Sequence, residues 1–347
     1  MYKLELFDER MKNAGAAIID APTIDLDYLA FDAFTVSSPT VPCKKGYFAH
    51  ITNGRQLVAD CIVSDVQTGV GTVEVSMRPL QALFDVDVFA SAITNVGSWL
   101  VQQITEQFVS NSDTLQNRPV KVTNAVHTAF SLTESDSETL NLIDIMSQAL
   151  TIYGIYVNAY LDIEEMQVVV QILPPGAPKT LEADLENVLD KTVNLGDSYG
   201  STNKLVIRRK VTDKETGVVS YPDQSVYYLH PDGTVDMTDG NRITPVFWAL
   251  ANLADSETWD QDAQDKAVET LTPEQFDNEI ALQYRAEDRL VQPGAIQIGT
   301  TATIIVDGTA YTSILTGRKI EPGTVTLTFG AVRVALTKRL ILQRRKK

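Results

Sequence analysis

The chain has 347 residues, of which 44% are hydrophobic and 21% are charged. This composition is typical of a folded protein and excludes a disordered one, and the length exceeds the roughly 100–200 residues of a single domain. The 45 acidic residues outnumber the 29 Lys and Arg residues, which gives a formal net charge of −16. Such a surface repels nucleic acid, so we expect no sequence-specific nucleic-acid binding.

We expect neither a secretory signal nor a membrane-spanning segment. The first residues carry both charge signs and lack an apolar core. The most apolar window, 149–161, is interrupted by Gly154 and Asn158 and is too short to span a bilayer. Cys43 and Cys61 form neither a disulfide framework nor a metal site by themselves, and they fit synthesis in a reducing compartment.

Two strand patterns near the N-terminus flank a hairpin signal. The β-rich runs 46–51 and 57–66 lie on either side of Asn53-Gly54. Asn-Gly favours a type I′ turn, because both central residues of that turn need a positive φ. A glycine-rich turn then leads to an alternating strand at 72–76, so we expect a β-meander here.

The hydrophobic period changes to three or four residues after position 88, which predicts two amphipathic helices. Ser135 and Glu138 have the spacing of a capping box before the second helix. Strands are expected at 120–122, 126–132, 156–161 and 167–173, so residues 88–176 are interpreted as an α/β insert. The apolar positions of the helices are Phe89, Ile93, Val96, Leu100, Ile104 and Phe108, and then Leu140, Ile143, Met146, Leu150 and Tyr153.

Strand patterns return after residue 177. A strand begins at Lys204, and Asp232-Gly233 is a further hairpin signal. The residues that follow predict a small helical insert up to residue 277, after which the pattern is again that of strands. The two short helices expected in this insert lie at 242–254 and 262–271.

A second β-meander is predicted at 299–342. Asp307-Gly308 lies between two apolar runs and favours a type I′ turn. Pro322-Gly323 suits the next turn, because proline fixes a negative φ and glycine accepts a positive one.

The two predicted meanders have the same order of features. Each has a strand, an Asn-Gly or Asp-Gly turn, a second strand, a glycine turn and a strand that begins Gly-Thr-Val, followed by Arg78 or Arg333. Any two meanders share glycine turns, so chance similarity is the alternative interpretation. The agreement in turn type, order and spacing favours two related β-domains at opposite ends of the chain.

No catalytic, cofactor-binding or metal-binding residue is assigned. The sequence lacks the zinc-peptidase, α/β-hydrolase, dinucleotide-binding and P-loop motifs. His50, His127 and His230 are far apart and lack metal-ligand spacing to one another or to the cysteines. Cys43 and His50 could form a nucleophile and its base, but such a site also needs an orienting group and an oxyanion hole.

Charged pairs and the basic C-terminus have a functional alternative beside a structural one. The carboxylates of Glu164-Glu165 or of Asp25 and Asp27 could cleave a glycan, although solvated turns are favoured in a chain so rich in acidic residues. The basic residues 344–347 could contact an acidic partner, although a solvated terminus is favoured.

Four aromatic residues offer a further alternative. Tyr227, Tyr228, Trp248 and Trp259 could line a groove for a glycan or a protein, since exposed aromatic side chains anchor binding. Packing in the core is the commoner use of aromatic residues in apolar runs.

Short segments in a fixed order along the chain carry a family resemblance. They are Arg78-Pro79-Leu80 to Asp85-Val86-Asp87, Ser201 to Ile207, Tyr228-Leu229 with Asp232-Gly233, Arg242 to Val246, Asn278-Glu279-Ile280, Tyr311 to Gly317, Leu327 to Gly330, and Leu336-Thr337-Lys338. With these segments the chain resembles the baseplate hub and tail-tip family of bacteriophages. Phage-like bacteriocins and the upper part of type VI secretion spikes share this family.

The resemblance implies an α+β fold with two tube-type β-barrel domains, an α/β insert between them and a small helical insert in the second barrel. The first barrel is expected at 1–87 and the α/β insert at 88–176. The second barrel is expected in two parts, 177–241 and 278–347, with the helical insert at 242–277 between them.

The resemblance also implies a structural role without enzymatic activity or cofactor. A homotrimer of the family forms a pseudo-hexameric ring that joins the tail tube to the tip of a virion tail, which assembles in the host cytoplasm. The implied partners are the tail tube or distal tail protein, a tip, spike or receptor-binding protein, and the tape-measure protein. The sequence stops soon after the second meander, so cutting or adhesive activity is expected on a partner.

Two other functions stay open. The chain could bind a glycan or receptor of the host envelope through the region of Tyr227 and Trp248. It could also be a cell-wall hydrolase whose site lies in the α/β insert, between residues 89 and 173.

Overall fold

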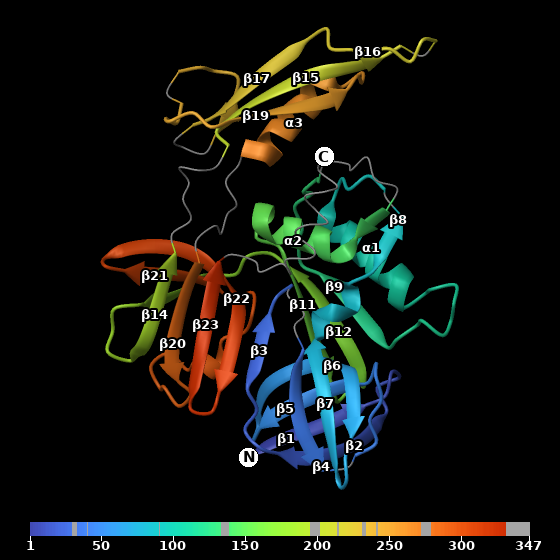
Figure 1. Cartoon of the computed structure of the whole chain (residues 1–347), viewed down its shortest axis with the longest axis vertical. Coiled ribbons are helices and arrows are strands. Elements are labelled where there is room, and N and C mark those ends of the chain that lie inside the picture. The colour runs from blue at the N-terminus through green and yellow to red at the C-terminus, as the bar shows by residue number, and fades with distance from the viewer. Residues whose placement is uncertain are drawn as a thin grey trace. The chain divides into compact units, whose positions relative to one another are not determined.

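A computed structural model of the chain is mostly β-structure, with three α-helices in the part that it describes (Figure 1). This part divides into two compact units, one of Met1–Leu195 with Asn278–Lys347 and one of Gly196–Asp277. None of the helices in this part is long and apolar enough to cross a membrane. The described residues are 1–29, 33–39, 41–89, 91–132, 139–194, 202–213, 215–230, 234–240, 242–271 and 279–330.

The first sheet of the larger unit is antiparallel and has six strands in the order β2-β1-β5-β6-β7-β4. Alternate residues point into its core, as Val73, Val75 and Met77 do in β7, because side chains alternate between the faces of a strand. The strands are β1 (Tyr2–Phe7), β2 (Asn13–Ile19), β4 (Phe34–Pro39), β5 (Phe48–Asn53), β6 (Gln56–Thr68) and β7 (Thr72–Pro79).

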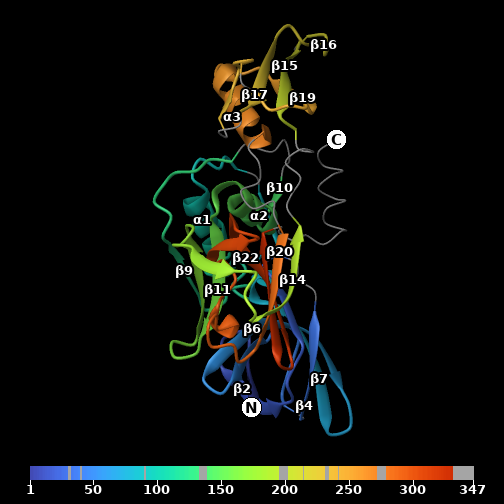
Figure 2. The ribbon, with the colours of Figure 1, turned by 90° about the vertical axis from the view of Figure 1, so that its left-hand side faces the viewer.

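The second sheet has the order β13-β21-β22-β23-β20-β14, and β3 also pairs with β22. Only the pairing of β13 with β21 is parallel among these described strands. Both sheets are strongly curved (Figures 1 and 2). The strands are β3 (Ile24–Asp27), β13 (Lys179–Glu182), β14 (Val188–Asn194), β20 (Glu279–Arg285), β21 (Thr301–Val306), β22 (Thr309–Glu321) and β23 (Thr324–Gly330).

The centre of each sheet is a meander of three strands with similar dimensions. The strands β5, β6 and β7 have 6, 13 and 8 residues, and β21, β22 and β23 have 6, 13 and 7. The long middle strand of each meander also has a register shift against the strand that follows, after Val63 in β6 and after Leu315 in β22. The two segments compared in the sequence therefore fold in the same way up to Gly330, and Arg333 lies outside the described residues.

The α/β insert contains two helices and a three-stranded sheet in the order β11-β12-β9. A second, two-stranded sheet pairs β10 with β8. A short 3₁₀ helix at Leu80–Phe84 leads from β7 into this insert. The elements are β8 (Asp87–Phe89), α1 (Val96–Phe108), β9 (Val120–Asn124), β10 (Thr139–Asn141), α2 (Leu142–Tyr153), β11 (Tyr156–Asp162) and β12 (Gln167–Leu173).

The helix boundaries in the insert differ from the prediction. The first helix begins at Val96 rather than near Phe89, because the side chain of Asn95 accepts a hydrogen bond from Ser98 N and caps the helix there. Phe89 lies in β8 instead. The N-cap of α2 is Asn141, which accepts from Ile143 N, whereas Ser135 and Glu138 lie outside the described residues.

The expected strand at 126–132 is wrong over most of its length. The structure has an isolated bridge between Leu132 and Ile93 there. The side chain of Asn124 accepts from Val126 N, so the chain turns directly after β9 instead of extending.

The smaller unit consists of one sheet with a helix on one face. Strand β15 pairs antiparallel with β16 and β17 and parallel with β19, and β18 pairs with β17. The helix α3 packs its apolar residues against one face of this sheet. The elements are β15 (Lys204–Thr212), β16 (Val219–Ser220), β17 (Gln224–Leu229), β18 (Val235–Asp236), β19 (Trp248–Ala254) and α3 (Trp259–Leu271).

This unit corrects two expectations. The helix expected at 242–254 is wrong, because β19 occupies its second half. Ala249, Ala251 and Leu253 face α3 while the residues between them are exposed, and this period of two belongs to a strand. The strands β15 and β17 also do not join the second sheet, because their pairing partners lie within their own unit.

Tyr284 of β20 provides a test of the second core. Its hydroxyl is buried and has no hydrogen-bond partner among the described residues. Burial, and then the charge of Asp288, raises the pKa of Tyr284 from 10.0 to about 12.

We predict that Tyr284→Phe leaves the free energy of unfolding at pH 7 unchanged or raises it by up to about 1 kcal/mol, because the change removes an unpaired buried hydroxyl. The wild type should lose stability as the pH rises from 10 to about 12, since the unfolded chain ionises this tyrosine first. Urea unfolding of both proteins at pH 7 and in this alkaline range measures the difference. A variant that is clearly less stable at pH 7 would contradict the assignment of an unpaired hydroxyl.

Candidate assembly site at the junction of the two sheets

Strand β3 joins the two sheets of the larger unit. It precedes most strands of the first sheet in the sequence, but it pairs antiparallel with β22 of the second sheet, with Ile24 opposite Ile320 and Leu26 opposite Arg318. Ile24, Leu26 and Ile320 are all buried in the core of the first sheet. Because β22 pairs with β21 through its first half and with β3 through its second half, the strand belongs to both packing systems.

Arg318 lies at the centre of this junction and is only 3% exposed. Its Nη2 donates to the carbonyl oxygen of Val58 in β6. Its Nη1 donates to the carbonyl oxygens of Ile296 at 3.3 Å and Gly294 at 3.4 Å, both in the loop before β21. The guanidinium therefore connects β6 of the first sheet to β22, which carries it, and to the loop before β21 of the second sheet.

The charge of Arg318 is held in place by backbone dipoles rather than by a carboxylate. Each protein acceptor that it meets among the described residues is a neutral oxygen. Burial lowers the pKa of the guanidinium to about 10, so it remains protonated at neutral pH. Burial also raises the pKa of the nearby Cys61 thiol well above its ordinary value, so this cysteine stays protonated there.

The α/β insert is attached to the junction through the edge of its sheet. Strand β11 lies at one edge of the order β11-β12-β9. The buried Tyr28 hydroxyl accepts a hydrogen bond from Val157 N at 2.7 Å, and Asp60 Oδ2 accepts one from Leu161 N at 2.9 Å. Side chains from outside the insert thus satisfy edge amides that would otherwise be free to pair with another strand.

Asp60 has a second contact that fixes its orientation. Its Oδ1 lies 2.6 Å from Nδ1 of His50 on the neighbouring strand β5, and its side chain is 4% exposed. Both carboxylate oxygens of Asp60 are therefore engaged within the fold. The carboxylate of Asp60 therefore links β5 of the first sheet to β11 of the insert.

Gly299 allows the loop before β21 to approach the insert. Its φ is +89°, and a Cβ atom at this position would overlap the ring of Tyr156. Only glycine combines this backbone conformation with this contact. The aromatic ring of β11 consequently packs directly on the backbone of the second sheet's leading loop.

A pocket of about 290 Å³ remains between these elements. Its lining is a mixture of polar and apolar side chains, including Asp60, Tyr156, Tyr160, Gln297 and Arg318. The carboxylate of Asp60 is already bound to His50 and Leu161, and the guanidinium of Arg318 is already bound to carbonyls, so neither is poised for proton transfer. The geometry is that of a junction between packed elements.

The residues considered for catalysis are not brought together in an active arrangement. Burial raises the pKa of Cys43 to about 11, whereas a nucleophilic cysteine needs a lowered pKa. Glu164 and Glu165 are exposed in the turn between β11 and β12, and Asp25 is exposed on β3. No group of three or more potential metal ligands occurs among the described residues.

The structure separates the four aromatic residues proposed for a groove. Tyr227 and Trp259 are buried between the sheet of the smaller unit and α3. Trp248 is exposed, and Tyr228 lies on the same face of the sheet as Trp248, opposite α3. The prediction that all four residues line one groove is therefore wrong, because neighbouring residues of a strand point to opposite faces.

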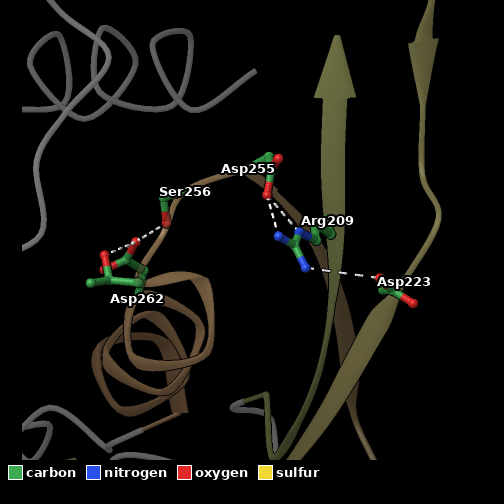
Figure 3. Close-up of polar contacts among 6 residues, drawn as sticks. Arg209, Asp223, Asp255, Ser256 and Asp262 are labelled. Atoms are coloured by element: carbon green, nitrogen blue, oxygen red, sulfur yellow. Dashed lines mark hydrogen bonds and ion pairs between the residues drawn. The ribbon is translucent and has the colours of Figure 1, made fainter. Parts of the chain in front are cut away.

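A polar cluster fixes α3 to its sheet (Figure 3). Arg209 of β15 donates through Nε and Nη2 to Asp255 at 2.6 and 2.5 Å, and Asp223 lies 4.0 Å from its Nη1. Ser256 Oγ donates to Asp262 Oδ2 at 2.5 Å, at the start of the helix. The connection from β19 to α3 is thereby held against β15.

The predicted hairpin turns have different geometries. Val306 pairs with Thr309, and both residues between them have positive φ, +48° at Asp307 and +79° at Gly308. These are the signs that a type I′ turn requires.

The type I′ prediction is wrong at the other described turn. Asn53 pairs with Gln56, so the two-residue loop is Gly54-Arg55, and only Gly54 has a positive φ. A glycine at the first loop position is typical of a type II′ turn instead. Asp232 and Gly233 lie outside the described residues.

We predict that Gly299→Ala lowers the free energy of unfolding by about 2–4 kcal/mol, because the new methyl group both strains the backbone and displaces Tyr156. Gly308→Ala is the matched control, since its φ is +79° and no atom lies within 4 Å of its Cβ position. That control should lose only about 1 kcal/mol. Denaturant unfolding measures both, and equal losses would show that the Tyr156 contact is unimportant.

We also predict that Asp60→Ala lowers the free energy of unfolding by about 2–4 kcal/mol, because it leaves His50 and the amide of Leu161 without their partner. Asp65→Ala is the control on the same strand. It removes an exposed carboxylate and should change the free energy of unfolding by less than about 0.5 kcal/mol. Hydrogen exchange at Leu161 should accelerate in the first variant alone. Unchanged exchange there would argue against this attachment of the insert.

Comparison with known proteins gives a result at the level of structure. No protein-family model and no curated protein matches the sequence. A chain of the phage P2 baseplate in its activated conformation has a TM-score of 0.54 and 11% identity, covering 95% of this chain and 98% of that chain. The 43 kDa tail protein of prophage MuSo2 from Shewanella oneidensis has a TM-score of 0.53 and 13% identity, covering 94% and 98%.

A tail protein from Neisseria meningitidis MC58 gives a similar result, with a TM-score of 0.52, 14% identity and coverage of 95% and 96%. These likenesses extend over almost the full length of both chains in each pair. They confirm the resemblance found in the sequence at the level of the fold. The chain has the fold of phage baseplate and tail proteins.

Proposed function

We propose that this chain is a structural baseplate hub of a phage or phage-like tail. Three copies form a pseudo-hexameric ring that joins the tail tube to the tip, and each copy contributes two tube-type β-barrels. The protein acts as a component of the virion tail and performs no reaction of its own. The observation that carries this proposal is the pair of similar meanders held together by β3 and Arg318.

A ring of this kind needs two similar modules in a fixed relation within one chain. The meander β5-β6-β7 and the meander β21-β22-β23 supply the similarity, down to a register shift in each long strand. The pairing of β3 with β22 and the buried contacts of Arg318 supply the fixed relation. Three such chains place six modules around one axis, because homo-oligomers favour closed symmetry.

The fold of the compared proteins supports the same role. One of them is described as part of a phage baseplate, and two are described as tail proteins. For this chain we propose the tail tube or distal tail protein and a tip, spike or receptor-binding protein as partners, with the tape-measure protein as a further one. The formal charge of −16 would keep DNA from adhering to the wall of such a ring.

In this proposal the first barrel corresponds to residues 1–87 and the α/β insert to 88–176. The second barrel includes β13, β14 and the strands from β20 onward. The smaller unit interrupts the second barrel in the sequence and forms a sheet with α3 on one face.

Recognition of the host envelope is the second candidate. It is favoured by the exposed Trp248, which lies on the same face of the sheet as Tyr228 with Lys204 between them, since exposed aromatic residues anchor binding. Binding of the purified chain to isolated envelopes distinguishes this candidate, because a hub should not bind them by itself.

We predict that the purified chain has the mass of three copies of its 38.2 kDa sequence. Light scattering over a range of concentrations measures that mass, and electron microscopy should show rings with six lobes. A chain that stays monomeric at every concentration and does not join a tail would contradict the hub role.

A further inference from the structure

The sheet of the smaller unit has one covered and one open face. Alternate residues of β15, β17 and β19, including Leu205, Ile207 and Tyr227, are buried beneath α3. The residues between them point to the opposite face. There Trp248 is 65% exposed and Leu250 is 49% exposed, both in β19, whose pairing partner among the described strands is β15.

The strand pairing arranges the open face in rows. Lys204 lies between Tyr228 and Trp248 as their direct cross-strand neighbour, and Val206 lies between Val226 and Leu250. The next row has Arg208 between Gln224 and Asn252. Trp248 and Leu250 therefore form an apolar strip on this face, and the cations Lys204 and Arg208 border it.

The cations of this face are held by aromatic rings and an amide. Lys204 Nζ lies 5.7 Å from the ring centre of Tyr228, and the guanidinium of Arg242, which also pairs with Asp239, lies 5.2 Å from the same ring. The guanidinium of Arg208 lies 4.2 Å from the ring of Tyr221, and its Nε donates to Asn252. Such contacts fix the charges in place while leaving their exposed sides free for another surface.

The open face is basic in a chain that is strongly acidic. Among the described residues of β15, β17 and β19, none that points to this face is acidic. At its β18 edge, Asp236 lies opposite Tyr228 and is bound to His230, and Asp239 pairs with Arg242. Helix α3 on the opposite face exposes Asp260 and Asp265 instead. A basic surface is opposite in sign to the formal net charge of −16 that a second copy of the same chain carries.

Symmetry decides between the two ways in which copies can pair. A twofold contact through this face would place Lys204, Arg208 and Lys210 of β15 in one copy near the same residues of the other copy, which like-charge repulsion opposes. A head-to-tail contact places the basic face on an acidic surface of the next copy. Contacts of this kind generate closed rings when the rotation between copies is suitable.

We propose that the open face of β15, β17 and β19 is covered in the assembled protein by an acidic surface of a second copy of this chain. The apolar strip of Trp248 and Leu250 provides the buried centre of the contact, and the cations around it form the polar rim. This inference rests on the proposed ring, and it assigns to the smaller unit the task of holding neighbouring copies together.

Trp248 reports directly on this contact. The other two tryptophans, Trp99 and Trp259, are each 6% exposed, so acrylamide quenches mainly the fluorescence of Trp248. In the trimer isolated by size-exclusion chromatography, quenching should be several-fold weaker than in the monomer obtained by dilution. Trp248→Phe should remove the difference between the two states, which verifies the source of the signal.

Charge reversal tests the same contact by assembly. The double variant Lys204→Glu/Arg208→Glu should raise the protein concentration that is needed for trimer formation at least tenfold. The control Lys45→Glu/Arg55→Glu makes an equal charge change at exposed residues of the larger unit and should not raise it. Circular dichroism of each variant checks that the fold is intact. An equal loss in both variants would attribute the effect to net charge and overturn the proposal.

The outcomes separate this inference from the hub role. The inference is overturned if Trp248 is quenched as strongly in the trimer as in the monomer. It is also overturned if the variant Lys204→Glu/Arg208→Glu forms trimers normally. Either result leaves the hub role intact. A Trp248 that is already shielded in the monomer shows that the chain covers its own face, which also overturns it. Shielding of the trimer's Trp248 only by added peptidoglycan fragments would identify a glycan as the occupant instead.

Discussion

The larger unit depends on the antiparallel pairing of β3 with β22. Without this strand pair, the first sheet and the second sheet would be two separate cores connected by loops. Arg318 reinforces the pairing from within, because its two Nη atoms donate to carbonyl groups from both sides, whereas its buried Nε has no partner among the described residues. A buried cation without a carboxylate partner is costly unless its donors are satisfied in this way. The cost keeps the surrounding carbonyls in one arrangement, and so it favours a single relation between the sheets.

The contacts that attach the α/β insert follow the same logic. Tyr28 and Asp60 reach the backbone amides of β11, and the glycine at 299 receives the ring of Tyr156. Each contact uses a polar group or a backbone position that cannot be replaced by a generic apolar residue. The junction is therefore defined by a few directional interactions within a larger apolar core.

Local sequence patterns predicted the parts of the fold whose causes are local. The Asp307-Gly308 turn, both meanders up to Gly330 and the strands β9, β11 and β12 of the insert follow from turn residues and from alternation along each strand. The Asn53-Gly54 turn differs because the register of β5 against β6 shifts the loop to Gly54-Arg55. The helix expected at 242–254 failed because the run WALANLA contains alanine and leucine, which favour helices, whereas its period of two and its pairing with β15 determine the outcome.

The junction could not be predicted from local patterns. Arg318 and Val58 are separated by 260 residues, and Tyr28 and Val157 by 129, so their contact depends on the complete topology. The sequence around Arg318, between Leu315 and Ile320, has no alternation because both faces of β22 are covered there. The sequence of this segment has two adjacent cations, Arg318 and Lys319, and does not show that Arg318 is the one that enters a buried polar contact. It does not indicate which carbonyls the cation meets.

The direction of the β3–β22 pair has a mechanical consequence. The hydrogen bonds of an antiparallel pair run perpendicular to the strands. A force directed along these strands therefore loads all bonds of the pair together, as in shear, and none can open before the others. A force directed across the strands would instead open them one after another, from Ile24 or from Asp27. The joint between the two sheets is thus stiff along one axis and compliant across it.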